Sequence, residues 1–397
     1  MFVLYLILSL ISVFLITGII EYYSHQKRIY SIPIRIHING TRGKSSVTRL
    51  VGAGLSAAGI PVITKVTGTY PRLILEDGNE IYIYRKAGAN IIEQLNIVKY
   101  AVQRKVKAIV IECMALEPQY QWITENKMIH ATIGVITNVR PDHTDVMGNT
   151  LPEIADALGK TIPEGKNFFT GENDNPNLLT EIAKKKGAEY YVANPNDVKP
   201  EEMTEFKYIE HRENVALALD ICTHLGIERN VALKGMYKAN PDPGALKMFK
   251  VKSFGKTLTL YNAFAANDPQ SSLMIWNKLR DEGRFKGTTI LLLNIRHDRL
   301  DRAKQLTEMI SLELNNQFDH LILMGESTEV VENLATGFGT DVKKIMNLGW
   351  KETSEIFENI LTLTVKEATI IGIGNMGGLG AKLAQYFEHR SEGTEYD

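Results

Sequence analysis

A glycine-rich loop near the start of this 397-residue chain restricts its fold to a small group. The loop reads Asn-Gly-Thr-Arg-Gly-Lys-Ser-Ser from Asn39 to Ser46, and the apolar, β-branched run Ile34–Ile38 precedes it. An amphipathic helical pattern follows the loop, with one face formed by Val47, Leu50, Val51, Leu55 and Ala58. A strand, a glycine-rich turn and a helix that starts with Lys-Ser together form the context of a phosphate-binding loop.

Each residue type in this loop suits the recognition of a nucleoside triphosphate. Backbone N–H groups around Gly40 and Gly43 are expected to surround phosphate oxygens at the helix N-terminus. Lys44 would neutralise the β- and γ-phosphates, and the hydroxyl of Ser45 would hold Mg²⁺. A tight turn that merely uses glycines would not need the Lys-Ser pair. The predicted nucleotide-binding residues of the loop are therefore Asn39, Gly40, Thr41, Arg42, Gly43, Lys44, Ser45 and Ser46.

The segment before the loop predicts a membrane anchor. Residues 1–20 include no charged side chain, and a helix of about 20 residues spans the ~30 Å hydrocarbon core of a bilayer. The aromatic pair Tyr22-Tyr23 and the basic residues Lys27, Arg28 and Arg35 follow, which places the C-terminal side in the cytoplasm. A cleaved signal peptide is the competing interpretation, but the first five residues supply no base. We expect a single-pass anchor at residues 1–24 with cytoplasmic catalytic domains.

Composition excludes several other classes of protein. The formal net charge of −1 argues against a nucleic-acid partner, for which a basic excess is expected. Cys113 and Cys222 are the only cysteines in the sequence, so the chain has neither a disulfide framework nor a CxxC metal pair.

Beyond the anchor, short β-rich runs alternate with helical patterns, which predicts parallel α/β sheets. Predicted strands lie at Lys107–Cys113, Thr132–Asn138, Asn167–Thr170, Glu189–Ala193, Leu258–Tyr261, Thr289–Asn294, His320–Met324 and Ala368–Ile373. Predicted helices lie at Ile91–Arg104, Leu151–Lys160 and Arg212–Leu225. The turn-rich segment 240–244 divides the alternation in two. We predict a phosphate-loop ATP-binding domain at 31–245, a Rossmann-like C-terminal domain at 246–390 and a tail at 391–397.

Acidic and histidine side chains follow two of the predicted strands. Glu112 lies at the end of the first, and Asp142-His143-Thr144-Asp145 follows the second. Because ligands of open α/β sheets bind beyond the carboxyl ends of the strands, Glu112 and His143 are expected to join Ser45 as ligands of a divalent metal. The alternative is structural: a strand-end glutamate is usually a solvated cap, and Asp-His-Thr-Asp is also a good turn sequence.

At this point the residues resemble the Mur ligase superfamily of ATP-dependent amide ligases. The segment from Gly40 to Ser46 is similar to its phosphate loop, and Glu112 and Asn138…Asp142-His143 match its metal-binding glutamate and Asn…Asp-His motif. The resemblance implies that Asn214 borders the adenine and that Asn262 and the following Asn267-Asp268-Pro269 belong to a ribose-binding segment. It covers roughly residues 34–390 and implies a Mur ligase-like fold with ATP and Mg²⁺, or Mn²⁺, as cofactors.

Within that superfamily, the chain most resembles the ligase subunits of poly-γ-glutamate synthases (the PgsB/CapB type). The phrases that carry this likeness are Lys65-Val66-Thr67-Gly68-Thr69, Asp142-His143-Thr144-Asp145-Val146-Met147-Gly148, Asp242-Pro243-Gly244-Ala245 and Asp298-Arg299-Leu300-Asp301-Arg302. It implies glutamate and growing poly-γ-glutamate as substrates and small membrane subunits of a capsule synthase as partners. Only 38 residues precede Asn39, so the UDP-sugar domain of cell-wall Mur ligases is expected to be absent.

Several residues depart from the family pattern. Lys160 is the nearest candidate for a carbamylated lysine, but its spacing is long and a surface helix lysine is the preferred interpretation. Ala245 and Leu246 replace the linker arginine after Pro-Gly, and Lys247 is a substitute candidate for a γ-phosphate contact. The stretch from Gly372 to Gly377 fits G-x-G-x-x-G, but a dinucleotide site needs a further βαβ unit. We expect a close strand-to-helix turn there rather than an NAD site.

The resemblance implies a reaction in which ATP converts the γ-carboxylate of glutamate into an acyl phosphate that an amine attacks. Lys44, Glu112 and His143 are the predicted catalytic residues. Arg296, Arg299 and Arg302 are candidates for binding substrate carboxylates, since guanidinium groups bind carboxylates bidentately. Ion pairing of these arginines with Asp298 and Asp301 is an equally good alternative. A folylpolyglutamate-type ligase and a membrane-anchored transport ATPase remain alternative functions.

Overall fold

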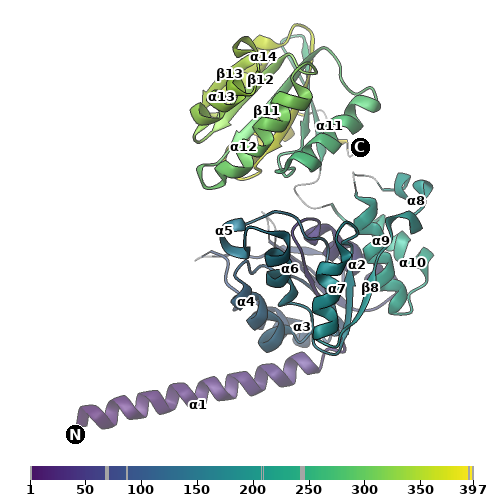
Figure 1. Cartoon of the computed structure of the whole chain (residues 1–397), viewed down its shortest axis with the longest axis vertical. Helices are drawn as coiled ribbons and strands as arrows, with labels where there is room; N and C mark the ends of the chain where they lie inside the picture. Colours follow the sequence, from purple (N-terminus) through teal and green to yellow (C-terminus); the bar gives the residue numbers. More distant parts are fainter. Residues whose placement is uncertain are drawn as a thin grey trace. The chain divides into compact units, whose positions relative to one another are not determined.

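The computed structural model describes residues 2–67, 71–85, 88–206, 208, 210–241, 246–391 and 394–395. The chain divides into two compact units (Figure 1). The first unit consists of Met1–Phe206 and Glu210–Asn240, and the second of Lys207–Ile209 and Pro241–Asp397. The predicted domain limit at residue 245 lies outside the described residues, because 242–245 are not among them. The domain limits therefore stay a prediction.

The first unit is built on a sheet of order β4-β3-β2-β5-β1-β6-β7-β8. Its strands are β1 (Ile34–Asn39), β2 (Val62–Val66), β3 (Arg72–Ile74), β4 (Glu80–Tyr82), β5 (Ala108–Glu112), β6 (Ile133–Ile136), β7 (Asn167–Thr170) and β8 (Glu189–Val192). β1 pairs in parallel with β5 on one side and with β6 on the other. The strand that leads into the phosphate loop therefore lies between the two strands that carry Glu112 and the Asp-His segment.

The prediction of parallel sheets is only partly right, because β3 pairs antiparallel with both β2 and β4. The physical reason is the short connection through Asp77 and Gly78, since antiparallel strands need only a tight turn and parallel strands need a long crossover. These two edge strands carried no clear sequence signal. The α/β fold class itself is confirmed.

Helices cover both faces of this sheet. They are α1 (Phe2–Tyr30), α2 (Lys44–Ala57), α3 (Glu93–Gln103), α4 (Pro118–Ile123), α5 (Thr144–Met147), α6 (Leu151–Gly159), α7 (Pro176–Lys185), α8 (Pro200–Thr204), α9 (Arg212–His224) and α10 (Arg229–Met236), with the π-helical turn η1 (Thr124–Ile129) and the 3₁₀ turn η2 (Pro195–Asp197). α2 packs against α9 and α10 on one face. On the other face, α3, η1 and the end of α1 share a core, and α6 packs on α7.

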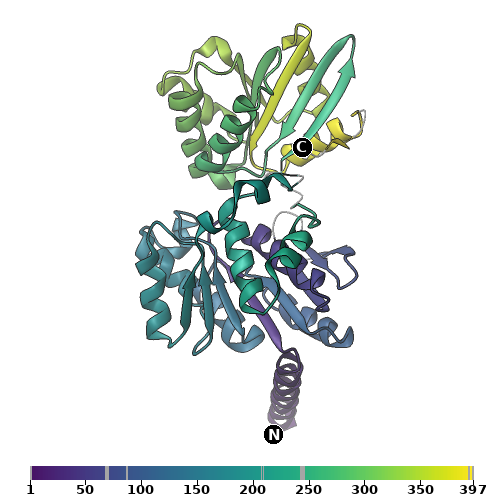
Figure 2. The same cartoon turned by 90° about the vertical axis from the view of Figure 1, so that its right-hand side faces the viewer.

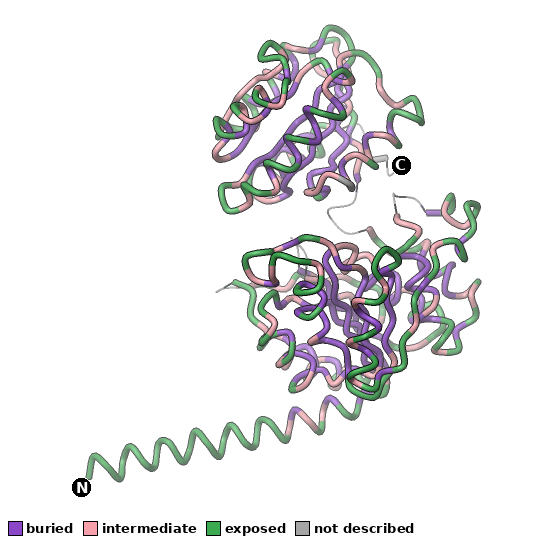
Figure 3. Tube along the Cα trace, in the orientation of Figure 1, coloured by how far each residue is buried: buried purple, intermediate pink, exposed green. Residues whose placement is uncertain are grey.

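The central strands explain why the phosphate loop is held rigidly. All five residues of β5 and the last five of β1 are buried, as expected for strands covered on both faces by helices. Figure 3 shows this core as purple strands inside exposed loops and helix faces. Because the strands cannot shift without exposing apolar side chains, the loop that follows β1 has a fixed starting point.

Helix α1 continues beyond the predicted anchor of residues 1–24. Its apolar part is exposed along its length (Figure 3), and by length and composition it is able to cross a membrane, with a mean hydropathy of 2.7. The helix then runs without interruption into the first unit, where His25 and Ile29 are buried. His25 Nε2 lies 2.7 Å from the Met128 carbonyl of η1, and Gln26 Nε2 donates to the Lys127 carbonyl at 3.1 Å. The end of the anchor helix is therefore part of the domain core.

The second unit is built on a sheet of order β13-β12-β11-β14-β10-β9-β15. Its strands are β9 (Lys247–Ser253), β10 (Lys256–Asn262), β11 (Thr288–Ile295), β12 (His320–Gly325), β13 (Ile345–Gly349), β14 (Glu367–Gly374) and β15 (Thr394–Glu395). The strands from β13 to β10 pair in parallel, whereas β9 forms an antiparallel hairpin with β10. Figure 2 shows this hairpin beside β14, drawn in yellow.

The hairpin and the C-terminal strand both differ from the predictions. Phe254 and Gly255 form the hairpin turn with φ of 47° and 72°, the pair of positive values that a two-residue hairpin requires. β15 pairs with β9, so the predicted tail at 391–397 contributes a strand. The edge of β9 offers unpaired backbone groups that this segment satisfies.

Helices of the second unit are α11 (Pro269–Asp281), α12 (Leu300–Met309), α13 (Thr328–Gly337), α14 (Thr353–Leu363) and α15 (Leu379–Glu388), with the turns η3 (His297–Arg299), η4 (Ile310–Leu314) and η5 (Val342–Lys344). α11, α12 and α13 share one core cluster with the sheet, and α14 packs on α15. β14 leads into α15 through the glycine-rich stretch, where Asn294 Nδ2 donates to the carbonyls of Asn375 and Gly377 at 2.5 and 2.9 Å. The expected close strand-to-helix turn is present.

Candidate functional site

The phosphate loop connects β1 to α2 and requires glycine at two positions. Gly40 has a φ of 132° and Gly43 a φ of 76°, values that L side chains rarely adopt. A Cβ at Gly40 would lie 2.0 Å from Thr137 Oγ1, and a Cβ at Gly43 would lie 2.5 Å from Asn214 Oδ1. The loop is thus closed by neighbours that leave no room for a side chain, and its backbone N–H groups lie at the start of α2.

Ser45, in the first turn of α2, contacts Glu112, the last residue of β5. Ser45 Oγ donates to the two carboxylate oxygens of Glu112 at 3.1 and 3.0 Å, and the backbone N–H of Thr67 donates to Oε2 at 2.6 Å. Glu112 is buried, with 3% of its surface exposed. A buried carboxylate that faces a hydroxyl at the N-terminus of a phosphate-loop helix is the arrangement that the sequence predicted for a metal site.

Lys44 lies over the loop. Its Nζ donates to the carbonyls of Gly40 at 2.6 Å and Thr41 at 3.3 Å. Burial lowers the pKa of Lys44, and the nearby carboxylates of Glu112 and Asp142 oppose that shift. The lysine is therefore held against the backbone of the loop, and its contact with nucleotide phosphates stays a prediction.

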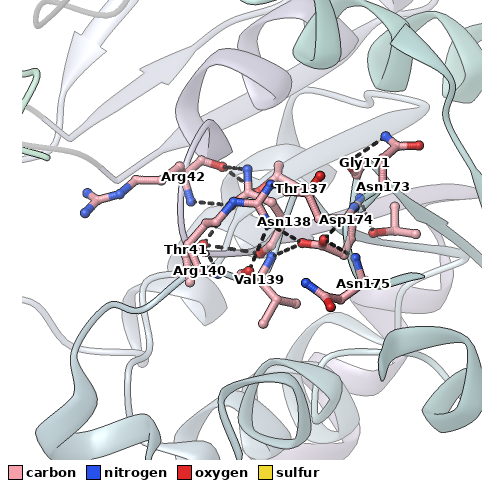
Figure 4. Close-up of polar contacts among 12 residues, drawn as sticks. Thr41, Arg42, Thr137, Asn138, Val139, Arg140, Gly171, Asn173, Asp174 and Asn175 are labelled. Atoms are coloured by element: carbon pink, nitrogen blue, oxygen red, sulfur yellow. Dashed lines mark hydrogen bonds and ion pairs between the residues drawn. The ribbon is translucent and has the colours of Figure 1, made fainter. Parts of the chain in front are cut away.

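Asn138 fixes the other side of the loop (Figure 4). Its Oδ1 accepts hydrogen bonds from Thr41 Oγ1 at 2.7 Å and from the Arg42 backbone N–H at 3.0 Å. Thr41 Oγ1 in turn accepts from the Arg140 backbone N–H at 3.0 Å, and Thr137 Oγ1 donates to the Arg42 carbonyl at 2.5 Å. The segment after β6 therefore holds the loop in shape through side-chain contacts to its backbone.

A second buried carboxylate, Glu172, orders the segment that contacts the loop. Its Oε2 accepts from the Val139 backbone N–H at 2.7 Å and from Arg140 Nη1 at 2.8 Å. Its Oε1 accepts from the backbone N–H groups of Asp174 and Asn175 at 3.1 and 2.9 Å. Figure 4 labels the partners Val139, Arg140, Asp174 and Asn175 in the same group of polar contacts as Thr41 and Asn138. The sequence analysis missed Glu172, although it follows a predicted strand just as Glu112 does.

Asp142 and His143 lie near the lysine side of the loop. Asp142 Oδ2 is 3.9 Å from Arg42 Nη1, and Asp142 Oδ1 is 3.8 Å from His143 Nε2. His143 adopts a φ of 46° at the start of the short helix α5. Asp-His-Thr-Asp is thus a helix-start segment, as the structural alternative held, and it also carries an acidic side chain to the charge environment of Lys44. The metal role of His143 stays a prediction.

The donor set fits Mg²⁺ or Mn²⁺ bound together with phosphates. Among the described residues, no group of three or more His, Cys, Asp or Glu side chains could hold a metal ion. Mg²⁺ commonly binds through one or two protein oxygens, with substrate phosphates and water completing its coordination. The hydroxyl of Ser45 and the carboxylate of Glu112 supply two such oxygens, so they could hold the ion once a nucleotide is in the loop.

Asn214, the residue expected to border the adenine, lies directly behind the loop. Its Oδ1 faces Gly43, and its Nδ2 donates to Glu210 Oε1 at 2.9 Å. Burial raises the pKa of Glu210, whereas hydrogen bonds from Asn214, the His211 backbone and Ser46 oppose that shift. The helix α9 is therefore tied to the phosphate loop through Asn214 and through the contact between Glu210 and Ser46.

A buried lysine next to this site was assigned no role in the sequence analysis. Lys65 lies in β2, and its side chain is fully buried. Its Nζ contacts Glu93 Oε1 at 2.5 Å and Gln94 Oε1 at 3.0 Å. Burial lowers the pKa of Lys65, while Glu93 opposes that shift. A lysine inside the apolar run Val62–Val66 was the available signal. The neighbouring positions 68–70 lie outside the described residues.

Of the other predicted residues, Lys160 belongs to the first unit and the rest belong to the second. Lys160 pairs with Asp156 at 2.9 Å as a surface lysine. Arg296 forms a bidentate ion pair with Asp298, with Nε–Oδ1 at 3.0 Å and Nη2–Oδ2 at 2.8 Å. The ion-pair alternative therefore describes Arg296, and the substrate role of Arg296, Arg299 and Arg302 stays a prediction. So does the nucleotide role of Asn262, which is buried at the end of β10, and of Lys247 at the start of β9.

Replacing Gly43 by alanine tests the geometry of the loop. The variant should weaken nucleoside triphosphate binding by at least about tenfold, because the new Cβ must displace Asn214 or the loop. Gly59→Ala is the matched control, since Gly59 has a φ of 74° but no atom within 4 Å of the added Cβ. Both variants should lose a similar stability of about 1–2 kcal/mol from the left-handed backbone. Calorimetric titration and thermal unfolding measure the two effects, and equal binding by both variants would contradict the proposed geometry.

Comparison with known proteins covers nearly the whole chain. Residues 38–240 match the family described as the Mur ligase middle domain, and residues 248–390 match the poly-gamma-glutamate synthase CapB C-terminal domain. The capsule biosynthesis protein CapB of Bacillus anthracis is 38% identical over 95% of this chain and 81% of its own length. PGA synthase CapB of Bacillus subtilis (strain 168) is 37% identical over 96% of this chain and 97% of its own length.

Solved structures agree on the fold. A bifunctional folylpolyglutamate synthase/dihydrofolate synthase from Yersinia pestis c092, complexed with AMPPNP and Mn ion, superimposes with a TM-score of 0.65. The match covers 91% of each chain at 15% sequence identity, so it shows a shared fold alone. The resemblance to Mur ligases that the sequence predicted is confirmed.

Proposed function

The chain belongs to the CapB family of poly-γ-glutamate synthases within the Mur ligase superfamily, and on this premise we propose that it adds glutamate to poly-γ-glutamate for a capsule or secreted polymer. Members of this superfamily are ATP-dependent amide-bond ligases, so the chain is an enzyme of that class. The observation that carries the proposal is the contact of Ser45 with buried Glu112 at the phosphate loop. This contact supports the proposal, because the phosphate-binding turn and the two proposed ligands of a divalent ion lie together.

The chemistry follows from the substrates. A carboxylate is a poor electrophile, because its leaving group would be oxide. Transfer of the γ-phosphoryl group of ATP to the γ-carboxylate of glutamate gives an acyl phosphate and ADP. An incoming amine attacks that carbonyl carbon, phosphate leaves, and the amine loses a proton as the amide forms. Catalysis of the phosphoryl step rests on positioning and on neutralising charge.

Residues of the first unit supply these functions. The backbone N–H groups between Gly40 and Ser46 and the Nζ of Lys44 bind and orient the phosphates. Ser45 and Glu112 would hold a divalent ion, whose charge would offset the negative charge of the phosphates. Asn138 keeps the loop in shape through Thr41 and the Arg42 backbone. His143, Asn214 and Asn262 are further proposed contacts of the metal, the adenine and the ribose.

The direct test of the proposal is the product made from ATP and labelled glutamate by membranes that contain the protein. We expect glutamate to enter a polymer with release of ADP. A folylpolyglutamate-type ligase would instead extend a folate acceptor, and a transport ATPase would release ADP without making either product. Parallel reactions with and without a folate substrate therefore separate the three functions, and ATP hydrolysis without glutamate incorporation would refute the ligase.

We further propose that α1 is a single-pass anchor that keeps the catalytic unit in the cytoplasm and contacts small membrane subunits. Removal of residues 2–23 should leave a folded protein that still hydrolyses ATP, because burial begins at His25. Removal of residues 2–30 should lower the free energy of unfolding by about 2–4 kcal/mol, since Ile29 and the His25 contact to Met128 are lost. Thermal unfolding and ATPase assays on the two truncations measure these effects. Equal stability of the truncations would contradict the structural role of residues 25–30.

Exchange of the anchor segment separates its anchoring in the membrane from its contact with partner subunits. When residues 2–23 are exchanged for an unrelated transmembrane helix, the protein should stay in the membrane and hydrolyse ATP but lose polymer export. Small and polar residues such as Ser9, Ser12 and Gly18 would be absent from the exchanged helix, and such residues commonly mediate helix contacts in membranes. Full capsule formation by the exchanged protein would show that the segment only holds the enzyme at the membrane and does not contact partner subunits.

A further inference from the structure

A cavity with a volume of about 520 Å³ opens on the flank of α2 in the first unit. Small residues of α2 and α10 form its floor, namely Gly52, Ala53, Ala57 and Gly235, and β2 and β3 contribute Thr64 and Ile74. Its size lies within the range of about 300–1,000 Å³ that is typical of ligand sites. None of its lining residues belongs to the phosphate loop or to any other site described above.

The charged lining of this cavity is predominantly positive. Arg49, Lys234 and Lys238 line it, with Glu80 as the acidic member. Burial alone would raise the pKa of Glu80, but the hydrogen bond and charge of Arg49, together with Asn240 and Arg72, lower it. Glu80 is therefore ionised and already engaged by the protein. Lys234 of α10 and Lys238 in the turn after this helix are exposed, so their charges are available to a ligand.

Arg49 pairs with Glu80, the acidic residue of the cavity lining. Its side chain is only 2% exposed. Nη1 and Nη2 contact the carboxylate of Glu80 at 2.7 and 3.3 Å, and Nη1 also donates to the Asn240 carbonyl at 3.4 Å. Among the described residues, Nε of Arg49 has no hydrogen-bond partner. That Nε is itself buried, so a ligand does not reach it, and the paired guanidinium and carboxylate leave Lys234 and Lys238 as the charges that a ligand in the cavity meets.

These features select for a ligand with several carboxylates joined by short apolar segments. The small lining residues accept methylene groups, while Lys234 and Lys238 offer positive charge and hydrogen bonds at two separate points. Among the residues that the structure describes, the lining includes no aromatic side chain on which a nucleotide base could stack. A γ-linked glutamate chain has this chemistry, because each repeat carries a free carboxylate and two methylene groups between its amides.

We propose that this cavity binds a segment of the poly-γ-glutamate chain. The inference rests on the proposed function and adds a polymer-binding site to it. α2 carries the phosphate-loop residues Lys44 and Ser45 at its start and the cavity floor further along. A chain held here stays with the enzyme between successive additions, so the cavity favours long products over repeated release of short ones.

The test measures binding of a fluorescent oligo-γ-glutamate to the full-length protein in detergent by fluorescence anisotropy. Lys234→Gln/Lys238→Gln should weaken binding by at least about tenfold, since charge-assisted hydrogen bonds to carboxylates are lost. Ser56→Trp, which places an indole at the cavity lining, should weaken binding without a change of charge. Lys184→Gln/Lys185→Gln is the matched control, because it removes two exposed charges from α7 in the same unit. This control should bind the oligomer as the wild type does.

Product length gives an independent measurement. The Lys234→Gln/Lys238→Gln protein should make shorter polymer than the control pair at equal glutamate consumption. The inference would be overturned if the wild type binds the oligomer and both the lysine variant and the Ser56→Trp variant bind it equally well. It would also be overturned if the control pair weakens binding as much as the lysine variant does. Displacement of the oligomer by ADP or by monomeric glutamate, at concentrations close to the dissociation constant of the oligomer, would also overturn it. A wild-type protein that binds the oligomer here but incorporates no glutamate would refute the proposed function and leave the binding site standing.

Discussion

Replacement of Lys44 by alanine is expected to lower the rate of amide-bond formation by at least about 10²–10³-fold, the usual cost of removing one group that stabilises developing charge. The Nζ of Lys44 lies over the loop, 2.6 Å from the Gly40 carbonyl, where it would face the phosphates of bound ATP. Glutamate incorporation by membranes that contain the variant measures the effect.

The control for this experiment is Lys99→Ala, which removes an exposed lysine from α3. The control should keep wild-type incorporation, and circular dichroism of both purified proteins should show an intact α/β fold. Lys44 also contacts loop carbonyls, so the thermal midpoint of Lys44→Ala should be recorded beside its activity. Normal incorporation by a folded Lys44→Ala protein would eliminate the ATP-ligase mechanism.

Replacement of Glu112 by glutamine is expected to raise the Mg²⁺ or Mn²⁺ concentration needed for activity by at least about 10–100-fold, since loss of even an indirect metal contact has an effect of that size. The glutamine keeps the volume of Glu112 and can still accept the hydrogen bonds from Ser45 and Thr67. It removes the negative charge that would attract the ion. Titration of activity against each metal measures the shift.

Two further variants complete this experiment. Ser45→Ala should raise the metal requirement in the same direction, because the hydroxyl is the second proposed ligand. Glu117→Gln removes an exposed carboxylate close by in the sequence and should behave as the wild type does. If activity depends on metal concentration in Glu112→Gln as it does in the wild type, Glu112 does not bind the metal and has only a structural role at the end of its strand.

Much of the fold could be predicted because its signals are local. The β7 strand at Asn167–Thr170 begins and ends where predicted, and the predicted helix at Arg212–Leu225 differs from α9 by one residue at its end. These segments have a strict apolar period and clear turn residues at their limits. The β3–β4 edge was missed because its strands have only three residues each and are partly buried, so they lack that period. β9 was missed although buried Phe249 and Val251 alternate with exposed Lys250 and Lys252.

The residues of the candidate site also differ in whether a local sequence signal identifies them. Lys44 and Ser45 were predictable because a phosphate loop is a continuous motif whose geometry depends on neighbouring residues. Glu112 was predictable only through its position at a strand end and through the family resemblance. Glu172 and Lys65 were not identified as part of the site, because each acts through partners that are remote in sequence. Glu172, for example, binds the backbone N–H of Val139, which lies 33 positions earlier.

The sequence by itself therefore determined the phosphate loop, the apolar N-terminal helix, the α/β class and the family. Each of these depends on residue order within a short segment, where backbone geometry and hydrophobic period act directly. Only the tertiary structure decided that Ser45 meets Glu112 across 67 positions, that the anchor helix ends inside the domain core, and that Arg49 and Lys234 share a cavity. Strand order and helix packing bring these groups together, and a pattern of neighbouring residues does not specify which distant segments will become neighbours.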